Sequence, residues 1–403
     1  MALTHPSSAR WSRLPHPPRR GVRWRWWPGC LLVALIGTAA CATPDAVADI
    51  AQSPQELPAD QRLYVDHEAS GSGDGSSWQH AYPRLQDALA RARTLAPAES
   101  VEVWVAEGVY YPSLGAGLSV GDRTRAFQLA NNVAIFGGFA GTETAAEQRD
   151  PAAHVTVLSG DIDRNDVVDA AGVTLQHGHI VGNNSYQVVR ANGVDASAVL
   201  SGFTVTGGLA NGGGLIESTY LMRRGAGLYL YSSAPRLSRL EIRGNLAEWG
   251  TDGRGAAIYG EAPSGTVVAP YIEHSRILHN RAHIGGGFYG FRSSIRAYGV
   301  QFLNNTAVNG GAAYLNLTTN VSFMNCIFAG NTATENGGAI YGFREFLAIV
   351  NSLMTGNYAV NDGGAYYAAT THGLNVPVVL TNTTVSGNRA GNLGGALFRN
   401  ASD

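Results

Sequence analysis

The chain has 403 residues, of which 45% are hydrophobic, 14% are charged and 51 are glycine, and its formal net charge is −2. The first 29 residues hold six of the 28 basic residues and no acidic one, which leaves 22 basic against 30 acidic residues, a charge of −8. This balance argues against nucleic-acid binding and against capture of acidic polysaccharides by charge alone. Two of the three cysteines, Cys30 and Cys41, belong to the N-terminal segment, so the rest of the chain has no internal disulfide framework.

The N-terminal segment is typical of an export signal. Arginines precede the apolar run Cys30–Ala40, and the small residues ahead of Cys41 resemble a lipobox. We therefore expect residues 1–41 to be an export signal of the lipoprotein type, with Cys41 as the lipidated first residue of the mature protein. Ordinary cleavage after Ala42 is the alternative. Residues 42–60 are rich in Ala, Pro, Asp and Gln, and would form a flexible tether.

Residues 61–100 are expected to contain a first strand and one helix. Leu63–Asp66 alternates as a strand does, and Leu85, Ala88, Leu89 and Ala92 fall on one face of a helix. An amphipathic helix at this place would close the N-terminal end of a stack of strands, whose core and backbone groups would otherwise be open.

The strongest polar cluster follows at residues 160–169. Oxygen-bearing side chains recur there at short intervals, as in calcium-binding loops, and the candidate ligands are Asp161, Asp163, Asn165, Asp166 and Asp169. The loop departs from the EF-hand pattern, because Asp166 stands where that loop needs glycine. A solvated loop rich in turns is the alternative to a Ca²⁺ site.

The second half of the chain repeats one phrase, clearest over residues 240–400. An apolar residue is followed three positions later by Asn and two positions after that by Ala, and a Gly-rich run comes next. The repeated asparagines are Asn245, Asn280, Asn305, Asn331, Asn357 and Asn388. Their spacings of 35, 25, 26, 26 and 31 residues indicate a basic unit of 25 or 26 residues with insertions in the first and last intervals. A fixed period of this length predicts a solenoid.

The repeats favour strands over helices. They contain short runs rich in β-branched and aromatic residues, bounded by Gly and Asn. We predict an all-β chain, a right-handed parallel β-helix over residues 101–403 with three strands per coil and an N-terminal amphipathic capping helix. The Asn is expected at positive φ in a tight turn, with its amide stacked on those of neighbouring coils. The Ala is expected to point inward, and a Gly-Gly pair to form the next bend.

The chain ends at Asp403, one strand after the sixth Gly-rich run, without a recognisable C-terminal cap. Because solenoids need their ends covered, the sequence predicts a fragment of a longer protein or a last coil that pairs with another chain.

Tyrosines follow the Gly-rich bends in successive coils: Tyr229, Tyr231, Tyr259, Tyr289, Tyr314, Tyr341 and Tyr367. Facing outward, they would form a stacking platform for sugar rings. Facing inward, which is the favoured arrangement, they would form an aromatic ladder in the core.

Two family resemblances follow from these motifs. Phe302-x-x-Asn305, Phe328-x-x-Asn331 and Gly337-Gly338-Ala339-Ile340 resemble the FxxN and GGAI repeats of chlamydial polymorphic outer-membrane proteins. The earlier half resembles secreted bacterial right-handed β-helix proteins of the pectate-lyase-like group, through Leu63–Asp66, Gly75–Trp78, Leu85–Leu89, Val103–Tyr110 and Phe136–Gly141. Together the resemblances cover residues 60–403 and imply the fold more strongly than an activity.

The expected protein is exported to the outer membrane or cell surface, or else secreted, and acts in adhesion or polysaccharide binding. Its expected partners are a polysaccharide or a host or cell-surface ligand, and a lipid on Cys41 would be its only contact with a membrane. A polysaccharide lyase or glycoside hydrolase is the alternative, with its site near residues 161–169 or outside this sequence. A structural surface rod is the third option. The sequence assigns no catalytic residue and no cofactor apart from Ca²⁺.

Overall fold

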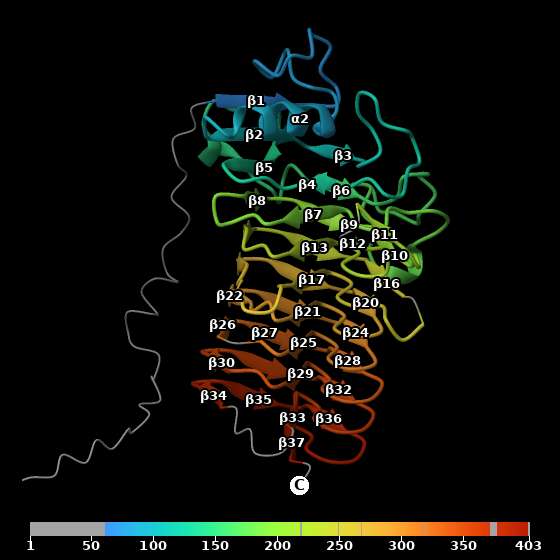
Figure 1. Ribbon diagram of the computed structural model, residues 1–403, viewed down its shortest axis with the longest axis vertical. Helices are drawn as coiled ribbons and strands as arrows, with labels where there is room; N and C mark the ends of the chain where they lie inside the picture. Colours follow the sequence, from blue (N-terminus) through green and yellow to red (C-terminus); the bar gives the residue numbers. More distant parts are fainter. Residues whose placement is uncertain are drawn as a thin grey trace, which may run out of the picture. The chain divides into compact units, whose positions relative to one another are not determined.

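The computed structural model describes residues 61–217, 220–248, 250–266, 268–318, 320–370 and 377–401. The predicted export signal, Cys41 and the whole of the predicted tether lie outside these residues. In the described part, the chain winds into coils whose strands stack in parallel (Figure 1). The predicted parallel β-helix is confirmed.

Four parallel sheets run along the stack, and we number them I to IV in the order in which a regular coil passes through them. The strands of sheet I are β1 (Gln61–Val65), β2 (Val101–Ala106), β5 (Val133–Phe139), β8 (Val199–Ser201), β14 (Arg236–Ser238), β18 (Tyr271–Glu273), β22 (Arg296–Tyr298), β26 (Val321–Met324), β30 (Leu347–Val350) and β34 (Val378–Thr381). The strands of sheet II are β3 (Gly108–Tyr110), β6 (Thr156–Ser159), β9 (Thr204–Thr206), β15 (Glu241–Arg243), β19 (Arg276–Leu278), β23 (Gln301–Leu303), β27 (Ile327–Ala329), β31 (Leu353–Thr355) and β35 (Thr384–Ser386).

The other two sheets complete each coil. The strands of sheet III are β10 (Leu209–Ala210), β16 (Leu246–Ala247), β20 (Arg281–Ala282), β24 (Thr306–Ala307), β28 (Thr332–Ala333), β32 (Tyr358–Ala359) and β36 (Arg389–Ala390). The strands of sheet IV are β4 (Phe127–Gln128), β7 (Val189–Asn192), β13 (Leu228–Tyr231), β17 (Ile258–Glu261), β21 (Phe288–Phe291), β25 (Ala313–Asn316), β29 (Ile340–Phe343), β33 (Tyr366–Thr370) and β37 (Leu397–Ala401).

A regular coil therefore has four strands, as in β22 to β25, and the expectation of three was wrong. The strands that it missed are those of sheet III. Each is only two residues long and consists of the residue pair that ends in the repeated Ala. A pair is too short to show the alternation by which strands are recognised in a sequence.

The predicted helix is α2 (Leu85–Leu95), which contacts β1 and β2 at one end of the stack (Figure 1). The four residues predicted for its apolar face are buried and belong to the main hydrophobic core. Gln86 is also buried, and its amide donates to the backbone oxygens of Pro112 and Ala126. The helix therefore covers the first coils with an apolar face, as the sequence predicted.

The repeated asparagines form a continuous ladder. In each step, the backbone N–H and the side-chain Nδ2 of one Asn both donate to Oδ1 of the Asn in the next coil, with lengths between 2.8 and 3.2 Å. The predicted stacking of amides is therefore correct, and the five ladder residues from Asn245 to Asn357 are almost completely buried.

The predicted backbone geometry of these asparagines was wrong. The positive φ belongs to the residue before each Asn: Gly244, His279, Asn304, Gly330, Gly356 and Gly387, with φ between 53° and 66°. The two roles are separate for a physical reason. The left-handed residue turns the chain, whereas the following Asn must direct its amide along the stack to the next coil.

The repeated Ala and Gly residues act as predicted. Ala247, Ala282, Ala307, Ala333 and Ala359 are buried. The first Gly of each pair has positive φ, for example 68° at Gly337. The second Gly leaves room for the adjacent coil: a Cβ at Gly311 would lie 2.4 Å from the carbonyl oxygen of Gly338.

Insertions interrupt the regular coils at their corners. The long first interval contains one loop between β16 and β17 and another between β17 and β18. An antiparallel hairpin of β11 (Leu215–Ile216) and β12 (Tyr220–Leu221) follows β10. Two short 3₁₀ helices, Ala146–Gln148 and His177–His179, lie in earlier loops.

Candidate ligand-binding surfaces

The tyrosines that follow the Gly-rich bends form one stacked row on sheet IV. The register aligns Tyr229, Tyr259, Tyr289, Tyr314, Tyr341, Tyr367 and Phe398. Neighbouring ring centroids lie 4.5 to 5.5 Å apart. Tyr231 does not belong to this row, because it pairs with Glu261.

The row lies on the outer face of sheet IV. Leu228 and Leu230, on either side of Tyr229, belong to the main core, whereas Tyr229 belongs to a separate cluster with Ile216 of the hairpin. The rings therefore face outward, yet Tyr229, Tyr259 and Tyr289 are buried. Because each ring stacks on the next, the ring faces are occupied and do not form an open platform for sugars.

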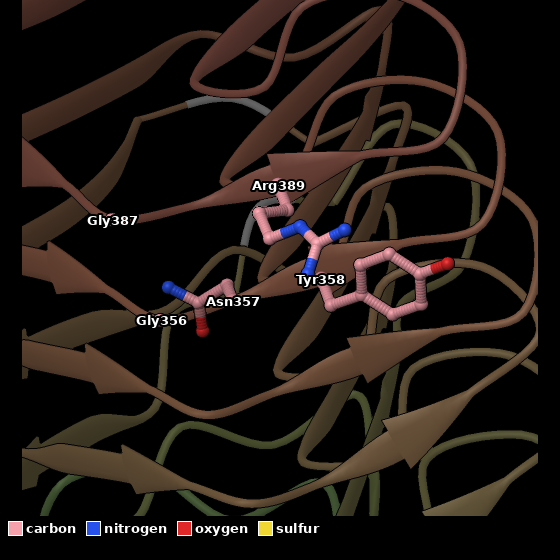
Figure 2. Close-up of a pocket in the computed structure, with 5 residues that line it drawn as sticks. All are labelled: Gly356, Asn357, Tyr358, Gly387 and Arg389. Atoms are coloured by element: carbon pink, nitrogen blue, oxygen red, sulfur yellow. The ribbon is translucent and has the colours of Figure 1, made fainter.

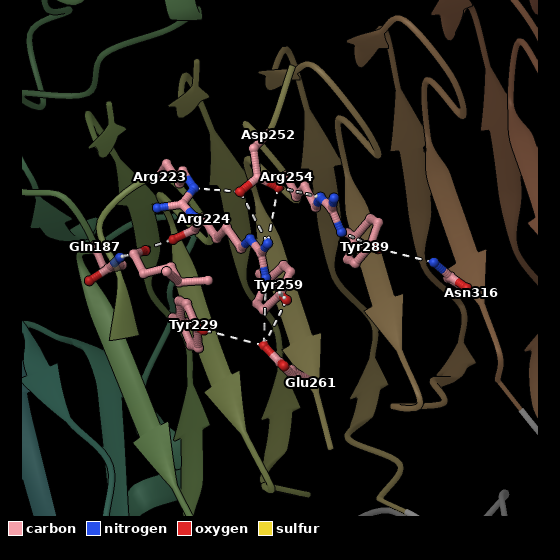
Figure 3. A network of polar contacts seen from close by, with 11 residues as sticks. Gln187, Arg223, Arg224, Tyr229, Asp252, Arg254, Tyr259, Glu261, Tyr289 and Asn316 are labelled. Atoms are coloured by element: carbon pink, nitrogen blue, oxygen red, sulfur yellow. Dashed lines mark hydrogen bonds and ion pairs between the residues drawn. The ribbon is translucent and has the colours of Figure 1, made fainter. Parts of the chain in front are cut away.

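An arginine–carboxylate network covers the buried part of the row (Figure 3). Arg224 donates through Nη1 to the Tyr259 hydroxyl at 2.7 Å, and Arg254 donates to the Tyr289 hydroxyl at 2.8 Å. Asp252, from the loop between β16 and β17, forms ion pairs with both arginines at 3.0 and 2.8 Å and also with Arg223. The inserted loop is thereby attached to the sheet.

The neighbouring arginines favour the ionised form of the Asp252 carboxyl group. Burial alone would raise the pKa of Asp252, but the hydrogen bond from Arg223 and the charges of Arg224 and Arg254 lower it below its ordinary value. The hydroxyl of Tyr259 donates to Glu261 at 2.8 Å, and burial raises the pKa of this tyrosine well above its ordinary range. The network therefore consists of paired charges that connect the inserted loop to the tyrosine row.

A groove lies on the outer side of sheet III. It has a volume of about 220 Å³, and residues from four successive coils line it: Leu246, Ala247, Glu248, Gly250, Arg281, Ala282, His283, Thr306, Ala307, Val308 and Thr334. The repeated alanines among them are buried and point inward, so the open surface comes from the outward residues, such as Arg281, Thr306 and Val308. Glu248 and Arg281 form a long ion pair of 3.9 Å, with side chains 60% and 50% exposed. Both can therefore bind a ligand from solvent.

A second hollow, of about 240 Å³, lies farther along the same sheet, between β32 and β36 (Figure 2). Gly356, Asn357, Tyr358, Gly387 and Arg389 line it. The Arg389 guanidinium lies 6.0 Å from the centre of the Tyr358 ring. This hollow involves two neighbouring strands of sheet III, whereas the groove lined by Glu248 and Arg281 extends over four coils.

Two of the predicted Ca²⁺ ligands are buried in the loop after β6. Asp161 accepts a hydrogen bond from the backbone N–H of Asn165 at 3.0 Å, and Asp166 accepts from the Thr174 hydroxyl and the Asn184 amide, both at 2.9 Å. Burial raises the pKa of both carboxyl groups, and the hydrogen bonds that they accept oppose this effect.

The other predicted ligands lie nearer the surface. Asp163 accepts from the backbone N–H of Asn183 at 2.9 Å, and Asp169 accepts from two backbone N–H groups of its own loop at 3.0 Å. In the part of the chain that the structure describes, no three His, Cys, Asp or Glu side chains are grouped so that they could hold a metal ion. Ca²⁺ binding by Asp161, Asp163, Asn165, Asp166 and Asp169 stays a prediction.

Sequence reasoning missed both the groove and the role of Asp252. The outward residues of sheet III, such as Arg281 and Thr306, stand immediately before the repeated Ala, and this periodic position could have indicated a common surface. No such signal exists for Asp252, because it lies in an insertion outside the repeat.

Comparison with known proteins bears on one coil. The model of the Chlamydia polymorphic membrane protein repeat matches residues 325–342. In the structure this segment runs from the turn before β27 through β28 into β29, and it includes Asn331 and the Gly337-Gly338 bend. No curated protein matches the chain. Among the described residues, no helix has the length and apolar character needed to cross a membrane.

The predicted resemblance to chlamydial polymorphic membrane proteins is thus confirmed at the level of this repeat. The resemblance of the earlier half to pectate-lyase-like proteins stays a prediction. The chain is a parallel β-helix in which at least one coil is similar to the Chlamydia polymorphic membrane protein repeat.

Proposed function

We propose that this chain is an exported cell-surface protein that binds carbohydrate, in adhesion, through the groove on sheet III. The groove is the observation that carries the proposal, because concave surfaces with a few converging polar groups are the usual ligand sites of proteins. The part-exposed apolar side chains of Leu246 and Val308 suit the C–H face of a sugar ring, and the polar side chains of the groove suit hydroxyl groups. Export is supported by the N-terminal sequence and by the similarity of one coil to a repeat of membrane proteins.

Glycan-array binding of the purified chain tests this proposal. Thr306→Tyr would fill the middle of the groove, and Thr384→Tyr, at an exposed outward position of β35 on sheet II, is the matched control. We expect binding to at least one glycan class that the first variant loses and the second keeps. Equal binding by both variants would contradict the assignment to the groove, and release of reducing ends from a bound glycan would favour the alternative of a glycan-cleaving enzyme.

A further inference from the structure

The shape of the groove limits its occupant to an elongated molecule. Its walls come from equivalent positions of successive coils, and adjacent coils are separated by the strand spacing of roughly 4.8 Å. A ligand that touches both Glu248 at one end and Thr334 at the other must therefore lie across the strands, along the axis of the stack. The volume of about 220 Å³ is less than the roughly 300–1,000 Å³ of pockets that enclose a whole ligand. A groove of this size suits a segment of a chain rather than a whole enclosed ligand.

The chemistry of the walls selects against a charged ligand. Glu248 and Arg281 supply one negative and one positive charge at the same end of the groove, so they cancel. A carboxylate accepts hydrogen bonds and a guanidinium donates them, so the two together match the adjacent hydroxyl groups of a sugar. Farther along, Thr306 and Thr334 offer hydroxyls, and Val308 offers methyl groups.

We propose that the groove on sheet III binds an uncharged, extended saccharide chain that lies along the axis of the stack, with Glu248 and Arg281 holding adjacent hydroxyls of one sugar. This inference rests on the proposed function and names the ligand class and its orientation.

Calorimetric titration with linear oligosaccharides of two to six residues tests the inference, in a neutral series and in a uronate series. We expect only the neutral series to bind, with an affinity that rises with length and then levels off once the groove is filled. Glu248→Gln and Arg281→Gln should each weaken binding at least tenfold. Glu147→Gln, an exposed change in a distant loop, should leave it unchanged.

The outcomes separate the two proposals. Preference for the uronate series, or stronger binding after Glu248→Gln, would overturn the uncharged class. Binding that neither Glu248→Gln nor Arg281→Gln weakens would overturn this inference but leave carbohydrate binding intact. Failure to bind any glycan would overturn both. Thermal melting of each variant checks that the fold is unchanged.

Discussion

The side-chain oxygen of Asn305 accepts two hydrogen bonds from Asn280, one coil earlier: 3.0 Å from the amide nitrogen Nδ2 and 3.2 Å from the backbone nitrogen. The same pair of bonds recurs along the whole ladder, so each amide connects two coils. Both residues are fully buried, and the stack therefore depends on these bonds for the pairing of polar groups that water cannot reach.

Removing one amide should open the ladder. Asn305→Ala leaves two donors of Asn280 without their acceptor and removes the bond from Asn305 to the backbone oxygen of Ile277. We expect a loss of about 3 kcal/mol in the free energy of unfolding, because buried groups that lose their partners cost roughly 1–3 kcal/mol each. Urea denaturation measures this loss. Asn304→Gly is the control, since Asn304 is exposed and its φ of 53° suits glycine; equal effects of both changes would contradict the ladder's role.

A buried carboxyl group should make the stability depend on pH. Glu345 is 3% exposed and accepts a hydrogen bond from the Tyr366 hydroxyl, and burial raises the pKa of Glu345 from 4.5 to about 7. Because the pKa is raised in the folded state, the contribution of Glu345 to the free energy of unfolding is complete below pH 4.5. It is lost as the pH rises through about 7. The loss amounts to roughly 3 kcal/mol at 1.36 kcal/mol per unit.

Glu345→Gln keeps an acceptor for Tyr366 and cannot ionise, so it should remove this pH dependence and stabilise the protein at pH 8. Melting temperatures of both proteins between pH 4 and 8 give the comparison, with Glu335→Gln as an exposed control. A parallel pH dependence in wild type and the Glu345 variant would show that another group is responsible.

The loop between β16 and β17 should lose its attachment when Asp252 is changed. We expect Asp252→Ala to lower the free energy of unfolding by about 1–2 kcal/mol, because the pairs are only partly buried. Since its folded-state pKa is lowered, the contribution of Asp252 is present above the ordinary carboxyl pKa and is lost as the pH falls through the folded value. A double-mutant cycle with Arg223→Ala measures the coupling; strictly additive effects at pH 7 would mean that the ion pair contributes nothing.

Calcium binding by the loop of residues 161–169 remains to be tested. The sequence predicts that millimolar Ca²⁺ raises the melting temperature and that Asp161→Asn with Asp163→Asn abolishes this rise, because the ligands bind only the folded state. Mg²⁺ at the same concentration controls for ionic strength. An identical melting temperature with Ca²⁺ and with chelator would make the loop a set of hydrogen-bonded turns.

Much of the fold was predictable because the repeat is visible in the sequence. The helix face of Leu85, Ala88, Leu89 and Ala92, the amide ladder and the Gly-Gly bends were all read correctly. One error was the number of strands in a coil, because the two-residue strands of sheet III show no alternation. Another arose where two properties had been assigned to one residue. The ladder Asn carries the amide, but the preceding residue, such as His279 or Asn304, carries the positive φ.

The surfaces were less predictable than the core. The tyrosine row was correctly seen as periodic, but the inward orientation favoured for its rings was wrong. The structure places them outward, and the hairpin and the arginines cover the first of them. Whether an outward ring is exposed depends on loops of irregular length, which a periodic pattern does not describe.

The sequence by itself determined the length of the coil and the residues that stack from one coil to the next. These features repeat because every coil meets the same steric and hydrogen-bonding demands from its neighbours. Only the tertiary structure decided where Asp252 meets Arg223, Arg224 and Arg254, and which side chains line the groove with Glu248 and Arg281. Those contacts join insertions and outward positions across coils, where no repeated packing constraint acts on the sequence.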